Sequence, residues 1–302
     1  MTLLQSSGIR LAILFIFLIL CPKIPHAQHT DTPAIAKEVS KQENIYRSRG
    51  GDIPEGYVID RSLLSYRFFL SPEFVLDLAR LGETDRWLDI GAGMGQAILD
   101  YHGPRYELMH PEVRTQRGKK AQAIALSVED RRTPIWNKTA LSLAPNKIGY
   151  FFGKRLREYS SGELGKFQLI TDLLGGFSYT ENLSLFMEKA LGFLAIDGNF
   201  YTLLLDVHLE NGTNQRPPSE LPYLTRITNT DGTEVKMCTW LKRITCIKVT
   251  CDSKGNPPIE IYRIHKVCNN ISVPALNLIH YEAGTPPERQ FQLLSSSSAS
   301  LP

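Results

Sequence analysis

The sequence predicts an α/β fold built on a doubly wound, mostly parallel sheet. Strand-like apolar runs alternate with amphipathic helical segments between about residues 60 and 210. The run at 200–207 (FYTLLLDV) is continuously apolar apart from its end, which is typical of a strand buried on both faces. A glycine-rich turn at 91–95 directly follows an apolar strand end. Together these observations favour a doubly wound α/β domain over an all-helical or all-β one.

The first predicted elements are a helix and the strand that follows it. Ser71 and Pro72 suit the N-cap and the first helical position. Apolar residues then recur at helical spacing as far as Leu81, and Gly82 suits the C-terminal stop. The strand at 86–90 comes next, and its glycine turn leads into a helix-compatible stretch.

The later elements continue the alternation and end in a β-rich region. Further strands are predicted at 121–128, 148–152, 167–174 and 200–207. Thr180 is expected to cap the helix that precedes the last of these strands. The segments 237–250 and 259–267 are rich in strand-forming residues, and a turn at 252–258 separates them. We expect them to complete the sheet as antiparallel strands, or to form a small appended ribbon.

The most informative motif is RWLDIGAGMGQA at 86–97. Glycines let the backbone adopt positive φ and approach a ligand closely. A dinucleotide site requires G-x-G-x-x-G, but the third position here is Gln96. The pattern present is D-x-G-x-G-x-G, which resembles the first motif of class I S-adenosylmethionine-dependent methyltransferases. The resemblance implies that S-adenosylmethionine is the cofactor and that its binding residues include Asp89, Gly91, Gly93 and Gly95.

The resemblance extends over about residues 60 to 210, with two departures. The family carries an acidic residue at the end of the second strand, for the ribose hydroxyls, but this sequence has Ala125 there. Glu129 and Asp130 lie just beyond, and we expect Glu129 to take over the role. The family has an acidic or polar residue after the third strand, whereas the segment at 153–157 is basic.

Two residues are candidates for the chemistry: Asp172 near the end of the fourth predicted strand, and Tyr179 seven residues later. Asp172 ends a predicted central strand, where open α/β sheets bind ligands. It is expected to contact the cofactor or the substrate, unless it only caps a loop. Tyr179 lies on the substrate side or packs beside the helix cap. The sequence identifies no general base, and the methyl acceptor is unknown.

The chain divides into five predicted regions. They are a signal peptide at 1–27, a polar N-terminal extension at 28–55, a Rossmann-like methyltransferase core at 56–210, a β-rich part at 211–294 that completes the sheet, and a disordered tail at 295–302.

The N-terminus and the cysteines both predict export. Ten consecutive apolar residues at 11–20 follow Arg10, which is typical of a signal peptide and too short to span a membrane. The mature chain therefore has no predicted span, although an uncleaved anchor is an alternative. Four cysteines remain after position 27, which suggests two disulfides with three possible pairings. These are Cys238, Cys246, Cys251 and Cys268. A zinc site is the rival reading, but no C-x-x-C pair exists and no metal is expected.

Charge gives no indication of nucleic-acid binding. The net charge of the 302 residues is only +3. The basic residues between 105 and 120 are expected to form a solvated loop, with a face for an acidic substrate as the alternative.

Three functions follow from these patterns. The first is methyl transfer from S-adenosylmethionine to an unknown acceptor by a secreted protein. The second is a secreted, non-catalytic interaction module that keeps the fold. S-adenosylmethionine is made in the cytoplasm, so a secreted enzyme would need a supply of cofactor at its destination, whereas a non-catalytic module would not. The third is an exported α/β hydrolase that uses Ser178, in a partial match to G-x-S-x-G whose last glycine is replaced by Thr180.

Overall fold

The computed structural model describes residues 32–47, 61–104, 106, 120–205, 224–255, 259–284 and 286–294. The expected signal peptide, the tail and most of the basic residues between 105 and 120 lie outside these ranges. No helix among the described residues has the length and apolar character needed to cross a membrane.

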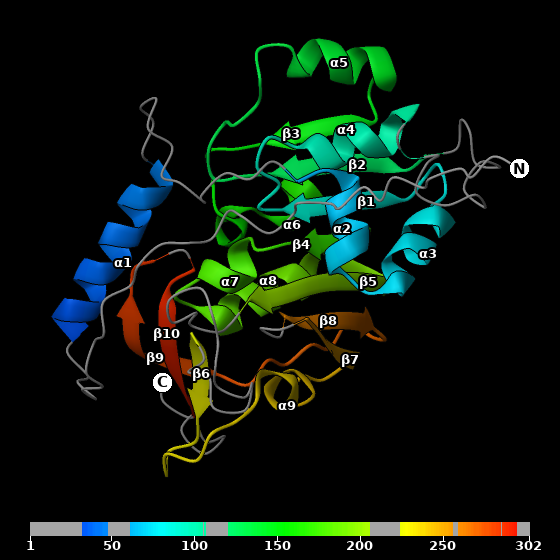
Figure 1. The fold of residues 1–302 in the computed structure, drawn as a ribbon. Coiled ribbons are helices and arrows are strands. Elements are labelled where there is room, and N and C mark those ends of the chain that lie inside the picture. The colour runs from blue at the N-terminus through cyan, green and yellow to red at the C-terminus, as the bar shows by residue number, and fades with distance from the viewer. Residues whose placement is uncertain are drawn as a thin grey trace, which may run out of the picture.

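A seven-stranded sheet forms the centre of the molecule (Figure 1), in the order β3-β2-β1-β4-β5-β8-β7. Its strands are β1 Arg86–Ile90, β2 Gln122–Leu126, β3 Ile148–Phe151, β4 Phe167–Asp172, β5 Leu194–Leu205, β7 Ile247–Lys254 and β8 Ile259–Lys266. The first five are parallel to their neighbours, and β8 and β7 follow as antiparallel strands. The predicted doubly wound, mostly parallel sheet is confirmed.

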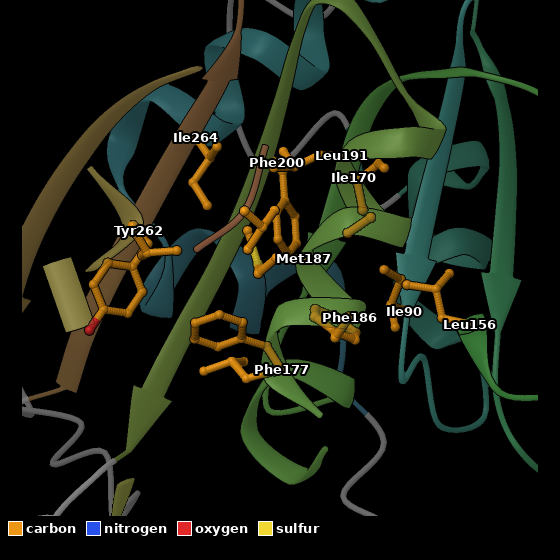
Figure 2. Close-up of a cluster of buried hydrophobic side chains, with 14 of the residues drawn as sticks. Ile90, Leu156, Ile170, Phe177, Phe186, Met187, Leu191, Phe200, Tyr262 and Ile264 are labelled. Carbon is orange, nitrogen blue, oxygen red and sulfur yellow. The ribbon is translucent and has the colours of Figure 1, made fainter. Parts of the chain in front are cut away.

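Helices cover both faces of this sheet because its strands carry apolar residues on both sides. One face packs against α2 Leu63–Phe69, α3 Pro72–Arg80 and α4 Gln96–His102. The other face packs mainly against α8 Leu183–Phe193, with the short helices η3 Leu156–Glu158, α6 Ser161–Leu164 and α7 Gly176–Tyr179. Figure 2 shows this second core, where Phe177, Phe186 and Met187 lie between the helices and the strands. The helix α5 Trp136–Leu143 packs beside α4.

A second, three-stranded sheet lies in the C-terminal part, in the order β6-β10-β9. Its strands are β6 Thr225–Thr228, β9 Leu276–Glu282 and β10 Glu288–Leu293. Figure 1 shows the helix α1 Thr32–Arg47 beside β9. Glu38 and Gln42 of α1 accept hydrogen bonds from the backbone N–H groups of Ala283 and Gly284. Part of the polar N-terminal extension is therefore an ordered helix, which the weak sequence pattern did not predict.

Two predicted elements differ from the structure. The segment expected to be strand at 237–250 begins with a helix, α9 Met237–Leu241, because its apolar residues Met237, Trp240 and Leu241 share one buried helical face. The helix expected to be capped by Thr180 begins at Leu183 instead. Asn182 is its N-cap, and its side-chain oxygen accepts a hydrogen bond from the backbone N–H of Leu185.

The four predicted disulfide cysteines form two bonds. Cys238 pairs with Cys251, and Cys246 pairs with Cys268. The first bond ties α9 to β7, and the second joins the chain before β7 to the chain after β8. Both bonds therefore fasten the antiparallel end of the large sheet.

The double substitution Cys238→Ser/Cys251→Ser should lower the free energy of unfolding by about 2–4 kcal/mol, because the unfolded chain regains the entropy of a 13-residue loop. Urea denaturation of the oxidised proteins measures the difference. In the presence of a reductant, wild type and variant should become nearly equal, and a gap that persists would contradict this assignment.

Candidate cofactor pocket

A pocket opens at the carboxyl ends of β1, β2 and β4. The turns that follow these strands line it through Gly91, Ser127 and Gly175, and the helix α1 adds Gln42. The space between atoms is about 1290 Å³, part of which is open to solvent. This is the edge at which parallel α/β sheets bind ligands.

The glycines of the motif have a backbone conformation that other residues rarely adopt. Gly91, Gly93 and Gly95 all have positive φ, at 69°, 57° and 76°. A Cβ on Gly91 would lie 2.6 Å from the Cα of Gly175, so the turn after β1 touches the turn after β4 backbone to backbone. Gly91 and Gly93 line the pocket, and Gly95 is the N-cap of α4 just behind it.

Ala125, near the end of β2, lies against the glycine turn and is not among the residues that line the pocket. Ala125 is fully buried inside β2, and a Cβ added to Gly95 would lie 3.3 Å from the Cβ of Ala125. Ser127 and Glu129, just beyond the strand, line the pocket. The Glu129 carboxylate also forms a salt bridge of 3.2 Å with Arg131, which lines the pocket as well.

Asp89 lies behind the pocket and is not among its lining residues. Its side chain is fully buried, and its two oxygens accept hydrogen bonds of 2.7 Å from the hydroxyls of Tyr66 and Thr171. Trp87 donates its indole N–H to the Thr171 hydroxyl. Burial raises the pKa of Asp89 to about 7, although the two hydrogen bonds oppose the shift. Its carboxylate holds α2 and β4 against β1.

Asp172 also points into the protein. Its carboxylate oxygens accept hydrogen bonds from the backbone N–H groups of Gly175 and Phe177, at 2.9 and 3.0 Å. The side chain is fully buried, and burial raises its pKa to about 7. The structure thus gives Asp172 the loop-capping role that the sequence analysis kept as an alternative.

Tyr179 lies in the wall of the pocket, whereas Ser178 does not. Burial raises the pKa of Tyr179 to about 12, so its phenol stays protonated at neutral pH and suits a donor better than a base. The Ser178 hydroxyl is buried and donates to the carbonyl oxygen of Leu203. Ser178 therefore lacks the exposed position that a nucleophile elbow needs. Four residues could act as partners of Ser178 in such a hydrolase: Asp206 and His208 lie outside the described residues, and His265 and His280 lie on β8 and β9.

Arginines and glutamates that line the pocket form ion pairs with one another. Arg155 forms a salt bridge of 2.8 Å with Glu43 of α1, and Arg157 pairs with Glu181. Both arginines belong to the basic segment after β3 and line the pocket, so this segment does reach the pocket. Both guanidinium groups form ion pairs with glutamates there. The Arg155–Glu43 bridge also fastens α1 across the opening.

Sequence reasoning missed Tyr150, which organises the pocket from β3. Its hydroxyl donates to the carbonyl oxygen of Gly93 and accepts a hydrogen bond of 3.3 Å from the backbone N–H of Arg131. One side chain thus joins the glycine turn to the loop that carries Glu129. Its position in a predicted strand gave no indication of this contact, which depends on the neighbouring strand β2.

Comparisons with known proteins gave weak structural similarity. No family model and no curated protein matches the chain. Solved structures that are similar include a geranyl diphosphate methyltransferase in complex with GPP and sinefungin (16% identity, 43% of this chain and 42% of that chain, TM-score 0.32). A second is an rRNA methylase from Streptococcus thermophilus (12% identity, 65% of this chain and 96% of that chain, TM-score 0.41). A third is an O-methyltransferase family protein from Burkholderia thailandensis (12% identity, 78% of this chain and 72% of that chain, TM-score 0.40). The match thus spans less than half the length of the first of these proteins. We therefore base the function on the pocket's own residues.

Gly91→Ala should destabilise the protein by at least about 2 kcal/mol, because alanine is strained at positive φ and its Cβ meets the Gly175 backbone. Urea denaturation measures the change. The matched control is Gly192→Ala in α8, where a Cβ meets nothing within 4 Å. The control should be neutral or stabilise by up to about 1 kcal/mol. Equal effects at the two positions would contradict the close approach of the two turns.

The buried carboxyl of Asp89 should make stability fall as pH rises from about 4 to about 7. In that window the unfolded chain has released a proton that the folded protein still holds, so the free energy of unfolding decreases with pH and levels off above it. Asp172, whose pKa burial also raises to about 7, contributes to the same decrease. Asp89→Asn should therefore make the decrease shallower without abolishing it, since the Tyr66 hydroxyl can turn to accept a hydrogen bond from the new amide. Urea denaturation between pH 4 and 8 measures the slope. The exposed control Asp252→Asn should keep the wild-type slope, and a wild-type slope in Asp89→Asn would refute the argument.

Proposed function

We propose that this protein binds S-adenosylmethionine in the pocket and transfers its methyl group to an acceptor not yet identified. The observation that carries the proposal is the folded D-x-G-x-G-x-G turn. Gly91 and Gly93 present bare backbone at the carboxyl end of β1, and Glu129 lies in the same pocket. A Cβ at Gly91 would lie 2.6 Å from the Cα of Gly175, so the close approach of these two turns beside the pocket requires glycine here.

Each part of the pocket has a role in this proposal. The glycine turn makes room for the methionine part of the cofactor, and the Glu129 carboxylate accepts hydrogen bonds from the ribose hydroxyls. When bound, the cofactor supplies a sulfonium-activated methyl group. The protein then needs chiefly to hold the acceptor in line and to exclude water. Tyr179 provides a phenolic donor on the wall of the pocket.

We also propose that the protein works outside the cytoplasm. The two disulfides support this, because disulfides persist in oxidising compartments. The apolar run at 11–20 would direct export.

A second candidate is a secreted module that binds the ligand without turnover. The observation in its favour is the orientation of Asp89 and Asp172. Both carboxylates are fully buried, hydrogen-bonded within the protein and absent from the pocket lining, so neither offers a base to an acceptor. Cofactor binding without methylated product from a pool of acceptors, followed with a radiolabelled methyl group, would favour this module.

Calorimetric titration with S-adenosylmethionine and S-adenosylhomocysteine tests the cofactor. We expect micromolar dissociation constants, and Glu129→Ala should weaken binding by roughly tenfold because the ribose loses charged acceptors. The control Glu188→Ala replaces an exposed glutamate on α8 and should bind as wild type does. A folded wild-type protein that binds neither compound at millimolar concentration would rule out the proposed function.

A further inference from the structure

The three-stranded sheet carries a group of metal-ligating side chains that the pocket does not use. The group consists of His280 and Glu282 on β9 and Glu288 on β10. Each offers one ligand atom, and the three atoms all lie within 4.8 Å of one another. All three side chains are partly buried, so their positions depend on the sheet more than those of freely exposed groups.

The backbone of the sheet brings these side chains together. Residues 280 and 282 are two apart on one strand, so their side chains emerge on the same face. The antiparallel register places Glu288 directly opposite Glu282. Like charges directly opposite each other destabilise a strand pair, and a cation held between them reverses this effect. An i, i+2 pair with a cross-strand partner therefore presents three ligands from one rigid surface.

We infer that His280, Glu282 and Glu288 bind a divalent transition-metal ion such as Zn²⁺. Zinc takes an imidazole nitrogen and carboxylate oxygens at about 2.0–2.2 Å, so two ligand atoms on one ion lie at most about 4.4 Å apart. The three atoms lie within 4.8 Å of one another, and small rotations of the side chains bring them onto one ion. The imidazole distinguishes the group from the all-oxygen sets that Mg²⁺ and Ca²⁺ prefer. Partial exposure leaves a coordination position for water.

The ion has a structural role, because its ligands lie on the face of β9 that points away from the cofactor pocket. Tyr281 lies between the two β9 ligands and lines the cofactor pocket, so the metal ligands project from the opposite side of the strand. Immediately after Glu282, the backbone N–H groups of Ala283 and Gly284 donate to Glu38 and Gln42 of α1. A metal ion that joins β9 to β10 here fixes the end of the strand on which α1 docks.

The test uses the purified full chain without an affinity tag, freed of metal with a chelator. Calorimetric titration with ZnCl₂ should give one site per chain with micromolar or tighter affinity. His280→Ala and Glu288→Gln should each weaken that site more than about tenfold. The matched control is His265→Ala, a partly buried histidine on β8 that hydrogen-bonds to Asn199 outside the group. It should retain the site.

A second readout separates metal binding from a loss of folding. Zn²⁺ should raise the melting temperature of the wild type and of His265→Ala clearly more than that of Glu288→Gln, which keeps nearly the same side-chain shape. Failure of the wild type to bind Zn²⁺, or an undiminished site in both His280→Ala and Glu288→Gln, would overturn the inference. Because no cofactor is present in these measurements, their outcome is independent of the proposed methyl transfer.

Discussion

The contact between Gly91 and Gly175 is the constraint on which the pocket depends. Two turns from neighbouring parallel strands approach so closely that one added carbon would lie 2.6 Å from a backbone atom. Hydrogen bonds hold both turns in place. The Asp172 carboxylate accepts from the backbone N–H groups of Gly175 and Phe177, and Gly91 donates its N–H to the carbonyl oxygen of Leu126. Backbone contacts therefore fix the floor of the pocket, and the side chains in its walls supply the polar groups that can contact a ligand.

Two buried carboxylates maintain this floor at an electrostatic cost. Asp89 and Asp172 end up fully buried on the neighbouring strands β1 and β4, and each raises its pKa through desolvation. Hydroxyl donors satisfy one carboxylate, and backbone N–H donors satisfy the other. Such groups are costly to bury without partners, so they specify the arrangement of α2, β1 and β4 closely. Acidic residues that a motif would assign to the ligand thus serve the scaffold.

The C-terminal part of the chain is coupled to the same pocket through Arg289. This arginine is fully buried on β10, where it donates to the carbonyl oxygens of Phe177 and Thr180 and to the hydroxyl of Thr225. It joins the second sheet to the segment that carries Tyr179. The small sheet in turn supports α1, whose Glu43 bridges to Arg155 at the mouth. The pocket is therefore enclosed by segments from both ends of the chain.

The sequence by itself determined the strand–helix order of the core, the glycine turn, the pocket edge and which four cysteines form disulfides, but it left their pairing open. These features depend on local periodicity and turn chemistry, which a short stretch of residues contains. Only the tertiary structure decided that Asp89 faces Tyr66 and Thr171, since Thr171 lies 82 positions away. It likewise placed α1 on β9 and packed Ala125 against Gly95. Contacts between distant segments depend on how the strands pair, and local sequence patterns do not specify the pairing.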